Sequence, residues 1–288
     1  MIKDLRKAIN YNRQARGRVW EQQQIPWGHL DAGTRKFALH VAAFQGSRGL
    51  KIDGMLGPKT FKAIQDKAEA VPQDQKFLIG GELVEVSEAL KALGTRMGEP
   101  FEARKRTKSP THIVIHESVT RSHQRTVDVL KSRNLGVHFS VDHDGTVFQH
   151  CDPLTEAPAH GNQLNSSSVA IEVVNPYYPH LGGEPWIVLE PAKWWTHVPQ
   201  KQDPAYVCPT EDQIKAVHAL VLWLCESVES LPLAFPTEKL GPRQTRIKGW
   251  KEKGKPDPGI VAHRDYSTHA DGRYILERLI ELEKSGDA

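Results

Sequence analysis

Cysteine is scarce in this sequence, and long apolar runs are missing from it. The 288 residues include three cysteines, Cys151, Cys208 and Cys225, and no Cys-x-x-Cys pair. An odd, widely spaced set of this kind excludes a disulfide framework and a zinc cage built from thiolates. No run approaches the 18 apolar residues that a membrane span requires, so we expect no membrane insertion.

The N-terminus lacks the apolar segment of a secretory signal. Its first residues, MIKDLRKAINYNRQ, carry charges throughout. We therefore expect synthesis in the cytoplasm without a signal peptide. With 39% hydrophobic and 25% charged residues, the composition is typical of a folded globular protein, and the length allows two domains.

Charge is unevenly distributed although the net charge is only +3. Residues 1–70 hold 13 Lys/Arg and 6 Asp/Glu, a balance of +7, whereas the rest of the chain balances at −4. The basic front predicts an anionic partner, and charge alone leaves open nucleic acid, a membrane surface or an acidic polymer. Of the 14 histidines, 12 lie between His112 and His269, which favours metal or acid–base chemistry in that region.

The basic front contains two predicted helices joined by a tight turn. Apolar spacing predicts a helix over 34–45, and the glycines and proline that follow predict a turn before the next helix. This pattern alone is compatible with DNA binding. However, FQGSRGLKIDGMLGPKTFKAI (44–64) resembles the peptidoglycan-binding type 1 module, with matches at Phe44, Gln45, Gly49, Leu50, Asp53, Gly54, Leu56, Gly57, Pro58 and Thr60. The resemblance implies a small three-helix bundle that holds bacterial peptidoglycan, and no nucleic acid.

The remainder of the chain alternates strand-like and helix-like segments. Strands are predicted at 111–116, 137–141, 146–150, 168–174 and 259–263, and a capping box of Thr210 and Gln213 begins an amphipathic helix. We therefore expect an α/β fold in which helices flank a mixed central sheet, preceded by the small all-α bundle.

Three segments follow from these patterns. We predict a peptidoglycan-binding domain over 1–72, a linker over 73–110 and a catalytic domain over 111–288. Within the linker, FLIGGELVEV predicts a short hairpin, and the basic run Arg104, Lys105, Arg106 and Lys108 is predicted to be solvated.

Polar side chains interrupt or end three of the predicted strands. His116 ends the first, Glu172 lies inside the apolar string VAIEVV, and His263 ends the last. A glutamate in such a strand must be paired, face solvent or serve a function, because burying it charged and alone is costly. Two neutral imidazoles and a carboxylate suit a zinc ion with an open position, and Asp271, eight residues after His263, can supply the carboxylate.

Residues 111–280 resemble the type 2 family of N-acetylmuramoyl-L-alanine amidases, which includes phage endolysins, wall-recycling amidases and animal peptidoglycan recognition proteins. The matching strings are IVIHES, GVHFSVDHDGTVFQH, APAHGN, NSSSVAIEVVN and AHRDYSTHADG. The resemblance implies one Zn²⁺ ion held by His116, His263 and Asp271. It also implies that Glu172 is the catalytic base and that His269 is a catalytic residue facing the substrate.

Two positions depart from the family pattern. Val137 stands where several lytic members have a catalytic tyrosine, so the base function falls to Glu172. His269 stands where others have lysine or threonine, and it could donate to an oxyanion or compete with Asp271 as a ligand. His160 and His138 are candidates for the wall of the site or for contacts to the ligands, with plain packing as the alternative.

The implied reaction is zinc-dependent hydrolysis of the amide bond between N-acetylmuramic acid and L-alanine. This reaction, together with the predicted wall-binding module, favours a monomeric, bacteriolytic phage endolysin. We expect such a protein to be made in the host cytoplasm and to act on the wall after its release from the cytoplasm. The alternatives are a non-catalytic peptidoglycan-recognition protein and a zinc peptidase acting on the stem peptide. The aromatic segment 176–209 is predicted to cover a sheet edge or to line a substrate groove.

Overall fold

The computed structural model describes part of the chain in detail. The described residues are 4–19, 34–35, 37–38, 41–42, 45, 50–61, 75–181, 189–191, 205–237, 240, 246–269 and 271–285. The chain divides into two compact units, residues 1–72 with 183–187 and residues 73–182 with 188–288. Among the described residues, none of the helices combines the length and apolar character needed to cross a membrane.

The first unit contains helix α1 (Leu5–Val19) and a turn organised by the buried side chain of Gln45. The Gln45 amide donates to Asp53 Oδ1 (2.8 Å) and Thr60 Oγ1 (2.9 Å), and its oxygen accepts from Gly54 N (2.9 Å). Asn12 of α1 donates to Gly54 O (2.8 Å). These motif residues therefore shape the turn. Much of the predicted three-helix bundle lies outside the described residues, so the peptidoglycan-binding module stays a prediction.

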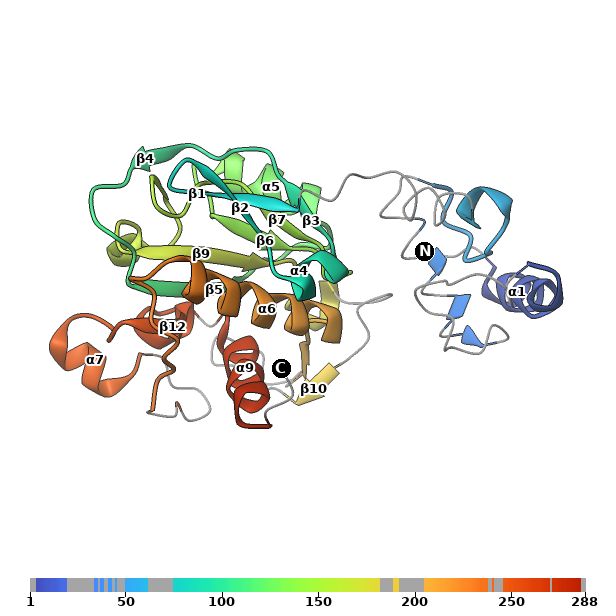
Figure 1. Ribbon diagram of the computed structural model, residues 1–288. Helices are drawn as coiled ribbons and strands as arrows, with labels where there is room; N and C mark the ends of the chain where they lie inside the picture. The colour runs from blue at the N-terminus through green and yellow to red at the C-terminus, as the bar shows by residue number, and fades with distance from the viewer. Residues whose placement is uncertain are drawn as a thin grey trace. The chain divides into compact units, whose positions relative to one another are not determined.

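A six-stranded mixed sheet forms the centre of the second unit, in the order β12-β5-β9-β6-β7-β3 (Figure 1). All neighbouring pairs are parallel except β6 and β7. The bounds of the strands are β3 Thr95–Met97, β5 His112–Glu117, β6 Phe139–Val141, β7 Val147–Gln149, β9 Ser168–Val173 and β12 Gly259–Ala262. The central strands β5 and β9 are buried along their whole length, as their apolar sequences predict. The structure thus confirms the five predicted strands and the mixed sheet.

Helices cover both faces of this sheet. On one face, Ile113 and Ile171 pack in the main core with helices α4 (Glu88–Leu93), α6 (Glu211–Ser227) and α9 (Arg273–Ser285). On the other face, Ala170 packs against Val127 of α5 (His123–Ser132). Figure 1 shows α5 and α6 on opposite sides of the sheet. Side chains alternate along a strand, so His116 and Glu172, each one position after a main-core residue, lie on the α5 face.

The segment predicted as a linker, 73–110, is instead folded into the second unit. Strands β1 (Lys76–Ile79) and β2 (Glu82–Glu85) form the predicted hairpin, and α4 and the edge strand β3 follow. Phe77 and Leu90 are completely buried in the main core. Trp223 Nε1 of α6 donates to Glu85 O (2.9 Å). The linker prediction was wrong because several of the few apolar residues here, among them Phe77, Val86 and Leu90, are buried in the core.

Arg106 also differs from its prediction as part of a solvated run. Its side chain is buried and donates to three backbone carbonyls, those of Glu156 (3.0 Å), Ser166 (2.9 Å) and Ser168 (2.7 Å). The neighbouring Arg104 and Lys105 are exposed, in strand β4 (Ala103–Lys105), which pairs with β8 (Glu156–Pro158). The four basic residues of this run are equivalent in sequence, but only Arg106 is shown to bridge other segments of the fold, through its hydrogen bonds to the backbone around 156 and 166–168.

The aromatic segment 176–209 is described only in part. Strands β10 (Leu189–Pro191) and β11 (Ala205–Val207) pair in a separate two-stranded sheet, and η2 (Pro179–Leu181) precedes them. Tyr177 and Tyr206 are buried against each other, with ring centroids 5.2 Å apart. The remaining elements are η1 (Asn162–Leu164), α7 (Lys248–Lys253) and α8 (His263–Tyr266).

Candidate metal centre

Two neighbouring strands and one loop bring the predicted ligands together. Strands β5 and β12 are parallel, and Ile115 pairs with Ala262, so the next residues, His116 and His263, emerge at the same edge of the sheet. Carboxyl ends of parallel strands are the usual position of sites in α/β folds. Asp271 lies just before α9, on the loop that follows α8.

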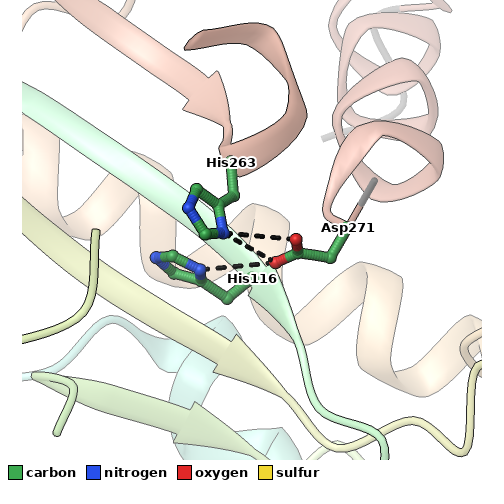
Figure 2. Close-up of side chains that lie close together, drawn as sticks. All are labelled: His116, His263 and Asp271. Atoms are coloured by element: carbon green, nitrogen blue, oxygen red, sulfur yellow. Dashed lines mark hydrogen bonds and ion pairs between the residues drawn. The ribbon is translucent and has the colours of Figure 1, made fainter. Parts of the chain in front are cut away.

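The three side chains converge on one point (Figure 2). His263 Nδ1 lies 3.2 Å from each carboxylate oxygen of Asp271, and His116 Nδ1 lies 3.4 Å from Asp271 Oδ2. The ligand atoms of all three residues lie within 4.8 Å of one another. Both histidines therefore present the same ring nitrogen, Nδ1, to the carboxylate.

The donor set fits a zinc ion. Two imidazoles and a carboxylate, with room for a further ligand, are a common set at catalytic zinc sites. Burial and the nearby His263 lower the pKa of His116 to about 4, so its ring is neutral at neutral pH. Burial alone would raise the pKa of Asp271, but His263 and His116 outweigh it and lower that pKa. A neutral imidazole and an ionised carboxylate are the forms that bind metal.

Glu117 holds the Asp271 loop in place, a function that sequence reasoning missed. Its carboxylate accepts from Gly272 N (2.7 Å), from Asn175 Nδ2 (2.9 Å) and from the Tyr206 hydroxyl. Gly272 has φ +85°, and a Cβ there would lie 2.2 Å from Ile115 O, so only glycine fits. Burial raises the pKa of Glu117 to about 7. The only sequence signal for this role was that a charged residue directly follows His116.

Glu172 is the carboxylate best placed to act as a base. It pairs with His116 across β9 and β5, and it is 7% exposed. Unlike the oxygens of Glu117, its carboxyl oxygens have no hydrogen-bond or ion-pair partner among the described residues. Burial, followed by the charges of Asp271 and Glu117, raises its pKa well above the usual value.

All these groups open into one cavity of about 490 Å³. Glu172, His116, His263 and Asp271 line it together with His269. Helix α5 and the segment that follows it form another part of the wall, through Leu130, Arg133 and Val137 among others, and Tyr177 and Tyr178 also line the cavity. A substrate can therefore reach the ligands and Glu172 from the same space.

His269 lines this cavity but does not join the group of metal donors. Its ring stacks on His263 with centroids 4.4 Å apart and an interplanar angle of 14°. It is exposed, and its backbone N–H donates to Ser267 Oγ (3.0 Å). This arrangement favours Asp271 over His269 as the third ligand. The catalytic role of His269 stays a prediction.

The other two predicted histidines lie in different places. His160 lines the cavity, and its Nδ1 lies 3.1 Å from His116 Nε2. His138 is completely buried and does not line the cavity. Its Nδ1 accepts from Ala170 N (2.9 Å), and burial together with Arg106 lowers its pKa to about 3. His138 thus packs as a neutral ring between strands, whereas His160 contacts His116, one of the predicted ligands.

Comparison with known proteins identifies the family of this chain. The family described as N-acetylmuramoyl-L-alanine amidase matches residues 106–272. No curated protein matches the chain. Similar solved structures include the endolysin amidase LysCS from Clostridium intestinale URNW, at 14% identity and a TM-score of 0.36, covering 65% of this chain and 94% of that one.

Two further structures are similar to about the same degree. Drosophila PGRP-LB is 14% identical with a TM-score of 0.34, covering 62% of this chain and 85% of that one. The Ph2119 endolysin from the Thermus scotoductus MAT2119 bacteriophage is 15% identical with a TM-score of 0.32, covering 61% of this chain and 88% of that one. At these scores the likenesses say nothing about chemistry, so the assignment rests on the family match, which spans more than half of the sequence. The chain belongs to the N-acetylmuramoyl-L-alanine amidase family.

Proposed function

We propose that this chain is a zinc-dependent hydrolase that cleaves the amide bond between N-acetylmuramic acid and L-alanine in peptidoglycan. The observation that carries the proposal is that Glu172 shares one cavity with the convergent donors of His116, His263 and Asp271. Zinc at such a site supplies Lewis-acid chemistry, polarising a carbonyl oxygen and lowering the pKa of a water molecule.

The side chains of the cavity perform the remaining steps. Glu172 takes a proton from the attacking water and passes it to the departing nitrogen. The water oxygen bonds to the lactyl carbonyl carbon as the carbon–nitrogen bond breaks, which leaves a lactyl carboxylate and a free amino group on L-alanine. His269 donates a hydrogen bond to the carbonyl oxygen as negative charge develops there.

The N-terminal unit serves as the wall-binding part of the same protein. Its motif residues 44–60 and its balance of +7 over residues 1–70 support a role in holding anionic wall polymer. In this proposal the protein is a monomeric phage endolysin made in the host cell. It reaches the wall after the lysis machinery has opened the membrane.

Digestion of purified peptidoglycan tests the activity. The full chain should release stem peptides that begin with L-alanine, detected by mass spectrometry and by labelling of new amino groups. Chelation should abolish the release, and added zinc should restore it. Glu172→Gln should lower kcat by ~10²–10⁴. The matched control Glu252→Gln, at an exposed position on α7, should leave kcat unchanged.

Other outcomes would overturn the proposal in distinguishable ways. New amino groups on residues within the stem peptide would identify a zinc peptidase. Binding to the wall without any cleavage would identify a recognition protein. Cleavage that persists at the wild-type rate in Glu172→Gln would leave the amidase standing and overturn Glu172 as the base.

A further inference from the structure

A hydrogen-bonded relay of His116, His160 and Ser168 runs from the candidate metal centre to the main chain. His116 Nε2 lies 3.1 Å from His160 Nδ1, and His160 Nε2 lies 3.0 Å from Ser168 Oγ. Ser168 Oγ in turn lies 2.7 Å from the backbone carbonyl of Leu164. The relay begins at the ring nitrogen of His116 that faces away from Asp271.

The backbone carbonyl at the end of the relay determines which atom donates and which accepts in each of its hydrogen bonds. A carbonyl oxygen can only accept, so the Ser168 hydroxyl donates its single proton to Leu164 O. Ser168 Oγ then accepts from His160 Nε2–H, which leaves Nδ1 of a neutral His160 as an acceptor. His116 must therefore carry its proton on Nε2, and its Nδ1 keeps a free lone pair toward Asp271.

The backbone around His160 is held firmly enough for this geometry to persist. Asn165 Oδ1 accepts from both His160 N (3.0 Å) and Gly161 N (2.6 Å). A Cβ at Gly161 would lie 2.4 Å from the Tyr266 hydroxyl, so the loop can approach closely only with glycine. Ser168 is completely buried at the start of β9. The positions of His160 and Ser168 in the relay are therefore both fixed by the surrounding structure.

We propose that His160 is a positioning residue that selects the tautomer of His116 able to bind metal through Nδ1, with Ser168 as its anchor. The inference rests on the proposed zinc site. In the other tautomer the proton of His116 occupies the ligand atom, and zinc binding must first displace it. Loss of a partner of this kind typically weakens metal binding 10–100-fold.

Zinc affinity of the full chain, measured by competition with a chromophoric chelator, tests the relay. His160→Leu removes the acceptor at similar size and should weaken zinc binding ~10–100-fold. In His160→Asn, the side-chain oxygen Oδ1 stands where Nδ1 of histidine stands and can accept the same hydrogen bond. This variant should therefore recover most of the zinc affinity. Ser168→Ala should also weaken binding, whereas Ser166→Ala, at an exposed position two residues earlier, should not.

Each result decides between the relay and the function on which it rests. Equal zinc affinity of the wild type and His160→Leu would overturn the relay and leave the proposed function intact. A wild-type chain that binds no zinc would overturn both. If His160→Asn binds zinc as weakly as His160→Leu and both melt at lower temperature, His160 serves only packing and the relay is overturned.

Discussion

Glu172 pairs directly with His116 in the parallel ladder of β9 and β5, and both side chains leave the same face of the sheet. The distance between the proposed base and the proposed ligand is thus set by backbone hydrogen bonds between two central strands, not by a loop. The same placement buries the carboxyl group among apolar strands. Its burial has consequences for both activity and stability.

Activity should fall in mild acid. Burial, with the charges of Asp271 and Glu117, raises the pKa of Glu172 well above its usual value of 4.5. A general base works only in its deprotonated form, so kcat/KM should decline as the pH drops through the raised pKa. The acid limb of the pH profile should therefore lie above pH 4.5, with circular dichroism recorded alongside to exclude unfolding. A flat profile down to that pH would contradict this.

The same raised pKa should cost stability at neutral pH. A carboxyl group that binds its proton more tightly in the folded chain contributes stability below its unfolded pKa, and this contribution is lost as the pH rises. Glu172→Gln should therefore raise the Tm of the metal-free protein at pH 8 and change it little at pH 4. Scanning calorimetry beside Glu252→Gln checks this. A lower Tm at pH 8 would show that the carboxylate is stabilising.

Sequence reasoning predicted the sheet and the convergence of the three proposed ligands because both depend on simple patterns. Apolar runs bounded by turns predict buried strands, and a histidine directly after such a run must emerge at a sheet edge. His116 and His263 follow this rule on neighbouring strands, and the structure places them together with Asp271.

Contacts between distant segments could not be predicted in this way. Glu117 binds Gly272 across 155 positions of the chain, and Arg106 reaches Ser168 across 62. Neither residue differs in sequence from an ordinary surface charge, because burial of a charge depends on partners that periodicity does not reveal. The relay through His160 likewise depends on a carbonyl whose place only the fold determines.

Removing the Glu117 carboxylate should loosen the Asp271 loop. Glu117→Ala leaves Gly272 N and the Tyr206 hydroxyl without this acceptor. The free energy of unfolding should fall by ~1–3 kcal/mol for each of these buried donors. Glu117→Gln keeps an acceptor oxygen and should lose less stability. Urea unfolding followed by tryptophan fluorescence measures both, and zinc titration should show weaker binding for Glu117→Ala. Equal stabilities of the two variants would mean that the hydrogen bonds of Glu117 contribute little.

The folded start of the second unit should decide which fragments are stable. A fragment of residues 73–288 retains Phe77 and Leu90 in the core and β3 on the edge of β7. A fragment of residues 111–288 loses all three, so we expect it to be insoluble or unfolded.

Point variants in the full chain separate packing from truncation artefacts. Phe77→Ala should lower the free energy of unfolding by ~3–5 kcal/mol, because the ring is completely buried against Phe139 and Trp223. Leu83→Ala, in the same hairpin but 62% exposed, should cost less than ~0.5 kcal/mol. Urea denaturation of the four proteins gives the comparison. If residues 111–288 unfold at the same midpoint as residues 73–288, and Phe77→Ala matches Leu83→Ala, this segment contributes no stability despite its burial.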